Sequence, residues 1–242
     1  MKILSIETST AEGSIAFLEN DIVKFEIKST EQKRHSEVVH SFIEQGLEKL
    51  GWKISEIDLY ATTIGPGSFT GIRVSINSAK SFSFVFEKPI IGINSLTSLA
   101  HLNHKLVFSI PQINSITCMI NAYKNMVYFS QFEIVGGQVN CTIAPIVVRV
   151  QDLHTVITSP TAVFGDGFPT YETHIKDEVR AFCLRPPELV DYPAARINGS
   201  LANLLWLQRP HDSAFEWNLV SPLYLRASEA EENKKGIKYT PL

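Results

Sequence analysis

Residues 59–82 have the sequence LYATTIGPGSFTGIRVSINSAKSF, and the order of elements that they predict decides the fold. The run 59–64 is compact and rich in β-branched residues, which is typical of a buried strand. Glycines at 65, 67 and 71 permit positive φ and close backbone approach, and Ser68 or Thr70 can cap a following helix. The sequence therefore predicts a buried strand, a tight glycine turn and a helix that ends near residue 86.

The glycine turn GPGSFTG leaves two interpretations open. The unpaired N–H groups at the start of the following helix can bind an anion, so the turn can be a ligand cradle. Its residue order matches neither the P-loop nor the dinucleotide-binding glycine pattern, so it can equally be a structural joint between strand and helix.

The flanking residues predict an α/β protein of two lobes. Short β-rich runs at 3–6, 14–18 and 23–27 predict an antiparallel meander, and apolar residues at helical spacing predict a helix over 35–50. A strand at 90–93 and a helix from Ser95 to about Asn103 complete a first lobe over 1–104, joined by a helix at about 193–209. Strands at 106–110, 116–120, 127–135, 139–150 and 162–164 predict a smaller β-rich lobe over 105–192, before a C-terminal tail at 210–242.

Composition limits the classes of partner. The chain has 242 residues, 22 Lys and Arg against 25 Asp and Glu, and a net charge of −3, so a partner is needed if nucleic acid is to be held. Its three cysteines form no C-x-x-C pair, which fits a reducing compartment. With no signal-peptide pattern and no membrane-length apolar run, we expect a cytoplasmic protein without a membrane partner.

The opening IETST and the hairpin at 13–17 resemble the phosphate hairpin of actin-like ATPases and sugar kinases. Candidate nucleotide or phosphate contacts are Glu7, Ser9, Thr10, Gly65, Gly67 and Ser68. The alternative is an acid at a strand end beside hydroxyls that bond their own backbone. We assign no metal site, because the pairs His35/His40 and His101/His104 lack the spacing or the third ligand of a metal centre. We assign no catalytic residue, because the sequence has no G-x-S-x-G motif and no Cys beside a His.

The helices 35–50 and 69–86 have more apolar residues than one sheet contact requires. We therefore expect a partner-binding surface on them, and its candidate residues are His35, Val38, Val39, Phe42, Ile72, Ser75, Ile76 and Ala79. The small residues would let another helix approach closely. The alternative is burial within the chain itself.

These stretches together resemble the TsaB (YeaZ) family. The resemblance runs through ILSIETSTAEGSIAFL at 3–18, HSE at 35–37, GPGSFTGIRVSINSAKSF at 65–82, GINSLTSLA at 92–100 and PLYLR at 222–226. It implies an actin-like (ribonuclease-H-like) two-lobed fold with a reduced second lobe. It also implies a non-catalytic subunit that pairs through its two long helices with the paralogue TsaD, or with a second copy of itself.

In that family, TsaD carries the metal-binding His pair and transfers threonylcarbamoyl to adenosine in tRNA, and the ATPase TsaE joins the complex. The resemblance thus implies contact with tRNA only through the complex, and ATP or ADP bound there, with no cofactor assigned to this chain. Three departures favour a scaffold: Thr63 and Ile64 replace an Arg-containing pair, Asn121 and Tyr123 replace an acid and an Arg, and Glu7 replaces Asp. The competing hypothesis is an actin-like phosphotransferase or a peptidase that acts alone.

Overall fold

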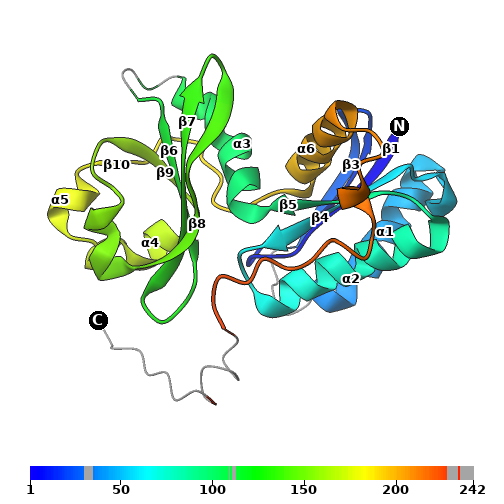
Figure 1. The fold of residues 1–242 in the computed structure, drawn as a ribbon, viewed down its shortest axis with the longest axis horizontal. Helices are drawn as coiled ribbons and strands as arrows, with labels where there is room; N and C mark the ends of the chain where they lie inside the picture. The colour runs from blue at the N-terminus through cyan, green and yellow to red at the C-terminus, as the bar shows by residue number, and fades with distance from the viewer. Residues whose placement is uncertain (30–34, 109, 111–112, 228–233, 235–242) are drawn as a thin grey trace. The chain divides into compact units, whose positions relative to one another are not determined.

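The computed structural model describes residues 1–29, 35–108, 110, 113–227 and 234, without the side chains of 35–37. It divides into two compact units, Met1–Ser98 with Pro193–Leu223, and Leu99–Tyr192 with Tyr224–Leu242. Each contains a five-stranded mixed sheet (Figure 1). The predicted α/β class and two-lobed organisation are confirmed.

The first unit has the strand order β3-β2-β1-β4-β5. Strands β1 (Lys2–Glu7), β2 (Gly13–Glu19) and β3 (Ile22–Ser29) are antiparallel, while β4 (Leu59–Gly65) and β5 (Ile90–Asn94) extend the sheet in parallel from β1. Three antiparallel strands followed by two parallel ones is the order that the sequence predicts.

Helices cover both faces of this sheet (Figure 1). On one face, α1 (His35–Leu50) and α2 (Phe69–Phe86) pack their apolar sides on alternate residues of the strands, such as Leu4, Ile6 and Tyr60. On the other face, α6 (Ala195–Gln208) packs on the intervening residues, such as Ile3 and Leu59. Since side chains alternate across a strand, each face has its own core.

The second unit has the same strand arrangement as the first, with smaller helices. Its sheet runs β8-β7-β6-β9-β10, formed by β6 (Ser115–Asn121), β7 (Met126–Val135), β8 (Gln138–Arg149), β9 (Thr161–Phe164) and β10 (Cys183–Leu184). The first three strands are antiparallel, and β9 and β10 continue in parallel from β6. The short helices α4 (Gly167–Tyr171) and α5 (Asp177–Arg180), with a 3-10 helix at Val150–Thr155, pack with the core on one side of the sheet. The actin-like fold with a reduced second lobe is confirmed.

Two details differ from the sequence-based expectation. The strand expected at 106–110 is wrong, because α3 (Ser95–Val107) continues through Val107 with a buried stripe at 96, 99, 103 and 107, and the described residues Phe108 and Ile110 lie in a turn and a bend. The boundary between the units falls after Ser98 rather than after residue 104, and 210–223 belongs to the first unit. The Leu223 N–H donates to the Ile64 carbonyl (2.8 Å), which joins that segment to β4.

In the ranges that the structure describes, no helix combines the length and the apolarity needed to cross a membrane. The three cysteine thiols are free.

The glycine turn generates the first prediction. A Cβ at Gly71 would lie 1.9 Å from the Thr8 carbonyl oxygen, so Gly71→Ala forces α2 away from the turn after β1. Helix propensity alone would favour this change by about 1 kcal/mol, whereas we expect a loss of more than about 2 kcal/mol in the free energy of unfolding. Urea unfolding measures it, with Asn77→Ala on the exposed side of α2 as the control. A Gly71→Ala protein as stable as the control would contradict the close approach.

Candidate functional site

The turn after β1 encloses an acidic side chain. The Glu7 carboxylate is fully buried, and its Oε1 accepts hydrogen bonds from the Ser9 N–H (2.7 Å) and the Ser9 hydroxyl (2.6 Å). Its Oε2 accepts from Asn198 Nδ2 of α6 at 2.9 Å. Burial raises the pKa of Glu7 above its ordinary value, and these hydrogen bonds oppose the rise. All three donors to the acid therefore come from the chain itself.

The glycine turn packs directly on this acidic turn. The Ser68 N–H donates to the Ser9 carbonyl (2.7 Å), and the Thr8 hydroxyl donates to the Gly71 carbonyl (2.7 Å). A Cβ at Gly67 would lie 2.2 Å from the Ser9 carbonyl oxygen, so only glycine fits there. The Ser68 hydroxyl accepts from the Gly71 N–H (3.3 Å) and caps α2. The turn acts as a joint between two segments of the same chain.

The structure thus brings the six predicted nucleotide contacts together, but it leaves little of their surface accessible to a ligand. Glu7, Ser9 and Thr10 are at most 3% exposed, and the Thr10 hydroxyl donates to the Glu12 carbonyl. Gly65 is buried with a positive φ of 99°, while Gly67 and Ser68 are partly exposed. The structure directs the polar groups of Glu7 and Ser9 toward other groups of the chain.

Three further residues of this polar cluster were not among the predicted site residues. The Ser95 hydroxyl donates to the Ser9 hydroxyl (2.9 Å) and is also bonded to the Thr63 hydroxyl (2.8 Å). Asn198 reaches Glu7 from 191 residues along the chain. Thr63 lies near the end of β4 and Ser95 directly follows β5, which is a weak signal in the sequence, whereas nothing local marks Asn198.

Most of the predicted partner-binding residues lie in the core of the first unit, which corrects the expectation of an exposed stripe. Val39, Ile72, Ser75, Ile76 and Ala79 are 0–2% exposed. The Ser75 hydroxyl donates to the Ile6 carbonyl (2.9 Å) and pairs with the Thr62 hydroxyl (2.6 Å). The small residues therefore let α2 approach its own sheet, and not a second helix.

Val38 and Phe42 are partly buried, and the side chain of His35 lies outside the described residues. The exposed side of the two helices is mainly polar instead. On α1 it consists of His40, Ser41, Glu44, Gln45, Glu48 and Lys49, and on α2 of Thr70, Arg73, Asn77, Ser81, Phe84 and Val85. This set is called the outer face below.

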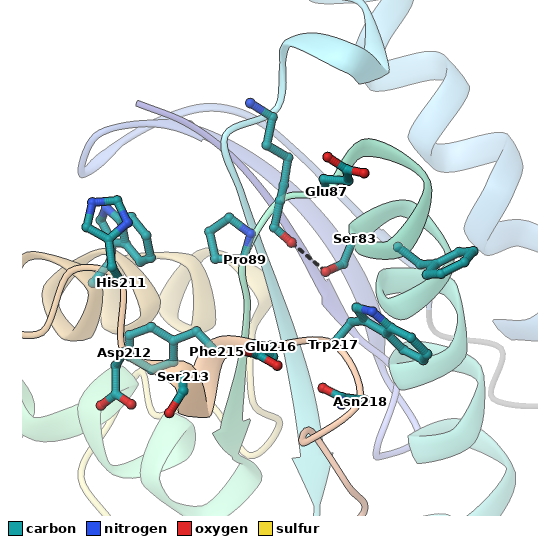
Figure 2. Close-up of a pocket in the computed structure, with 13 residues that line it drawn as sticks. Ser83, Glu87, Pro89, His211, Asp212, Ser213, Phe215, Glu216, Trp217 and Asn218 are labelled. Carbon is teal, nitrogen blue, oxygen red and sulfur yellow. Dashed lines mark hydrogen bonds between the residues drawn. The ribbon is translucent and has the colours of Figure 1, made fainter.

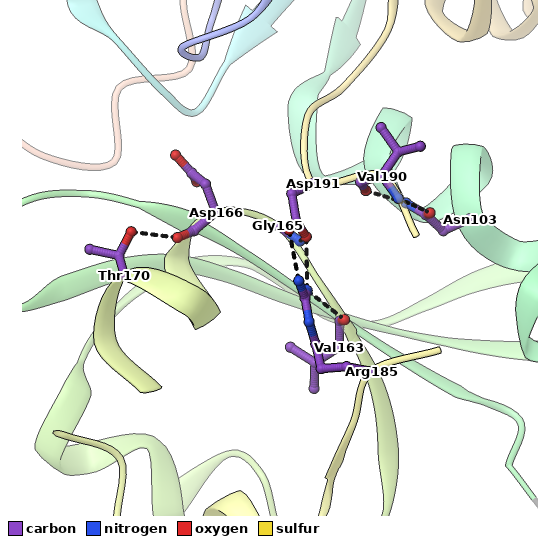
Figure 3. A network of polar contacts seen from close by, with 8 residues as sticks. All are labelled: Asn103, Val163, Gly165, Asp166, Thr170, Arg185, Val190 and Asp191. Carbon is purple, nitrogen blue, oxygen red and sulfur yellow. Dashed lines mark hydrogen bonds and ion pairs between the residues drawn. The ribbon is translucent and has the colours of Figure 1, made fainter. Parts of the chain in front are cut away.

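In the second unit, the loop after β9 contains a partly buried carboxyl group, that of Asp166 (Figure 3). Its Oδ1 accepts the Asn121 N–H at 2.9 Å. Burial raises the pKa of Asp166 to about 6, and the Asn121 N–H opposes this shift while the charge of Asp191 adds to it. Asp191 accepts from both Arg185 nitrogens (2.8 and 2.7 Å) and from the Gly165 N–H (2.7 Å).

Asn121, which stands where the resemblance leads one to expect an acid, is bonded within its own loop. Its Oδ1 accepts the Tyr123 N–H (2.8 Å) and the Tyr171 hydroxyl (3.1 Å). Tyr123, Lys124 and Asn125 all have positive φ between 52° and 62°. His101 and His104 of α3 contact each other, and across the described part of the chain no group of three or more His, Cys, Asp or Glu is placed to hold a metal ion.

Comparison with known proteins identifies the family. Residues 27–234 match the family model described as TsaD: tRNA N6-adenosine threonylcarbamoyltransferase, and this match covers well over half of the chain. The chain belongs to the TsaD family.

Within the TsaD family, the resemblance to TsaB (YeaZ) predicted from the sequence is confirmed. The tRNA threonylcarbamoyladenosine biosynthesis protein TsaB of Haemophilus influenzae is 27% identical, over 93% of this chain and 94% of that protein. The solved structure of YeaZ from Pseudomonas aeruginosa is 21% identical, with a TM-score of 0.76 over 93% of this chain and 99% of that one, and so shows the shared fold.

The TsaD relatives are longer than this chain. The tRNA N6-adenosine threonylcarbamoyltransferase of Borreliella burgdorferi is 32% identical over 56% of this chain but only 44% of its own length, and that of Phytoplasma australiense is 30% identical over 47% of its length. The chain thus spans about half the length of the TsaD relatives that it matches.

Replacement of Glu7 tests the enclosed cluster of this TsaD-family protein. Glu7→Ala leaves Ser9 and Asn198 donors buried without an acceptor and opens a cavity, so we expect a loss of about 2–4 kcal/mol in the free energy of unfolding. Glu7→Gln keeps an acceptor for Ser9, and rotation of the Asn198 amide would supply its unpartnered Oδ1 to the new amide, so a smaller loss is expected. Urea unfolding at pH 7 compares the two, and equal stability of wild type and Glu7→Ala would contradict the cluster.

Titration of Asp166 gives a pH-dependent prediction. Because its folded pKa of about 6 exceeds its ordinary value of 3.8, the unfolded chain loses this proton first as the pH rises. The stability contributed by protonated Asp166 is complete below about pH 4 and is lost as the pH rises through about 6. In wild type, this titration should lower the free energy of unfolding by an amount on the order of 1–3 kcal/mol as the pH rises, and Asp166→Asn should remove this decline. Unfolding measurements on wild type and Asp166→Asn at several pH values give the difference. Glu172→Gln, at an exposed carboxyl of the same unit, should leave the decline unchanged.

Proposed function

We propose that this chain is a non-catalytic binding subunit in the biosynthesis of threonylcarbamoyladenosine in tRNA. The observation that carries the proposal is a comparison of chain lengths. The chain matches TsaB over nearly the whole of both proteins, but it spans only about half the length of its TsaD relatives. A chain of TsaB length is expected to assist a larger TsaD subunit that transfers the threonylcarbamoyl group.

The partner in this proposal is TsaD, and the outer face of α1 and α2 is its contact. That face lies opposite the sheet, so a partner can pack on it without disturbing the core (Figure 1). Exposed Asn77 and Ser81 are one helical turn apart, and their small size favours close packing of a second helix. A second copy of the chain would use the same face as a homodimer when TsaD is absent.

The other parts of the proposal concern the complex. TsaE joins it, ATP or ADP binds to it, and tRNA reaches this cytoplasmic chain only through it. Two observations support this assignment to the complex: the net charge of −3 gives no general attraction for phosphate, and Glu7 already has three donors within the chain. Turnover of ATP by the isolated chain that Glu7→Gln abolishes would instead favour the phosphotransferase hypothesis.

Mixing this chain with TsaD from the same source tests the pairing. Light scattering across a chromatography peak should show a 1:1 species, in place of any homodimer. Asn77→Trp puts a bulky side chain on the outer face and should weaken the pairing by at least about tenfold, because it prevents close helix packing.

The matched control is Gln208→Trp, at an exposed position of α6 on the opposite face of the sheet. It should pair like wild type. Two separate peaks for wild type under all conditions would contradict the pairing, and equal behaviour of the two tryptophan variants would place the contact away from α2.

A further inference from the structure

A second feature of the first unit is a groove between the C-terminal end of α2 and the segment that follows α6. Its cavity volume is about 510 Å³, within the range of pockets that hold ligands. Figure 2 shows Ser83, Glu87 and Trp217 on one side of it, and His211, Asp212 and Ser213 on the other. The groove is distinct from the glycine turn and from the buried acid.

The far wall of the groove is held by contacts of its own. Asp212 Oδ1 accepts the Ala214 N–H (2.9 Å), and its Oδ2 pairs with Arg209 (3.2 Å). The Trp206 and Phe215 rings, which also line the groove, lie 6.0 Å apart. These contacts order the loop without a ligand, so binding there would cost little conformational entropy.

The near wall presents two aromatic rings to solvent. Phe84 and Trp217 contact each other edge to face with centroids 5.0 Å apart, yet they are 61% and 43% exposed. The same pair also lines a second pocket, of about 250 Å³, together with Asn77, Lys80 and Ser81. The two rings therefore form a ridge with a pocket on each side.

Carboxylates outnumber cations around the larger pocket. Glu87, Asp212 and Glu216 line it, and Lys88 is the Lys or Arg residue among its lining residues. Glu87 occupies the left-handed position that ends α2 (φ 52°), and neither it nor Glu216 forms an ion pair with another described residue. Aromatic faces beside unpaired carboxylates attract a guanidinium or ammonium group and repel phosphate.

We propose that this groove binds a basic, extended peptide segment of a protein partner. One arginine or lysine stacks on the Phe84–Trp217 ridge and pairs with Glu87 or Glu216, while a neighbouring apolar side chain enters the smaller pocket. Two adjacent pockets suit a peptide, whose side chains are spaced along a backbone, better than a single small amine. The smaller pocket shares Asn77, Ser81 and Phe84 with the outer face, so the peptide is tested on the chain in the absence of TsaD.

The three tryptophans provide the readout. Acetylated and amidated Leu-Arg-Leu-Arg is titrated into the full chain, and the indole N–H resonances are followed by NMR. Those of Trp206 and Trp217 should shift, while that of Trp52, which packs on Phe17 in the core, should not. Binding should weaken as salt is raised, because exposed charges are screened. Acetylated and amidated Leu-Glu-Leu-Glu should cause no shift.

Charge reversal tests the residues. The double variant E87K/E216K should weaken binding of the arginine peptide by at least about tenfold, as should Trp217→Ala. Glu44→Lys, at an exposed carboxylate of α1, is the matched control for charge and should leave the affinity unchanged. The Trp52 resonance reports that each variant remains folded.

Several results would overturn the proposal. They are the absence of a Trp206 or Trp217 shift at millimolar peptide, equal binding of the glutamate peptide, and equal losses in E87K/E216K and Glu44→Lys. Binding of arginine amide as tight as that of the peptide would show a small-amine site instead, and shifts caused by a single-stranded RNA oligomer would show a nucleic-acid site. None of these results depends on whether TsaD binds the outer face.

Discussion

The first unit depends on the contact between the start of α2 and the turn after β1. Gly67 and Gly71 bring the glycine turn against the Ser9 and Thr8 carbonyls, at distances that exclude a Cβ. This contact ties β1, β4 and α2 together through the backbone, so the position of each follows from the others. It also uses the Ser68 N–H, one of the free donors at a helix start, for the chain's own carbonyl.

The buried carboxylate of Glu7 also positions α6, the helix on the opposite face of the sheet. Glu7 points toward α6, where Asn198 donates to it, and the Ser14 hydroxyl accepts from the Ala195 N–H at the start of that helix (2.8 Å). A buried carboxylate without such donors would be strongly unfavourable. The polar cluster therefore specifies where a helix from the far end of the chain docks, and this accounts for Glu7 without any ligand.

The sequence predicts the helices 35–50 and 69–86 and the strand order well, because periodicity and glycine placement are local properties. It does not show which neighbour covers an apolar stripe. Ile76 and Ala79 have the spacing of a binding face, yet they pack on their own sheet, whereas Phe84 remains outside. Asn198 and the groove residues 211–217 could not be predicted, since their roles arise only when α6 and the segment after it fold against the sheet.

These features separate the interior of the first unit from its surface. The residues that resemble a nucleotide site are bonded to one another, and the small residues that resemble a helix interface pack on the sheet. The surface of the first unit includes the outer face of two helices and, at the end of α2, the Phe84 and Trp217 rings next to Glu87 and Glu216. Exposed aromatic area of this kind is unfavourable in an isolated chain, because it gains stability only when another molecule covers it. Specificity in this protein is therefore expected to lie in its surfaces, while the turn that resembles a phosphate loop maintains the fold that presents them.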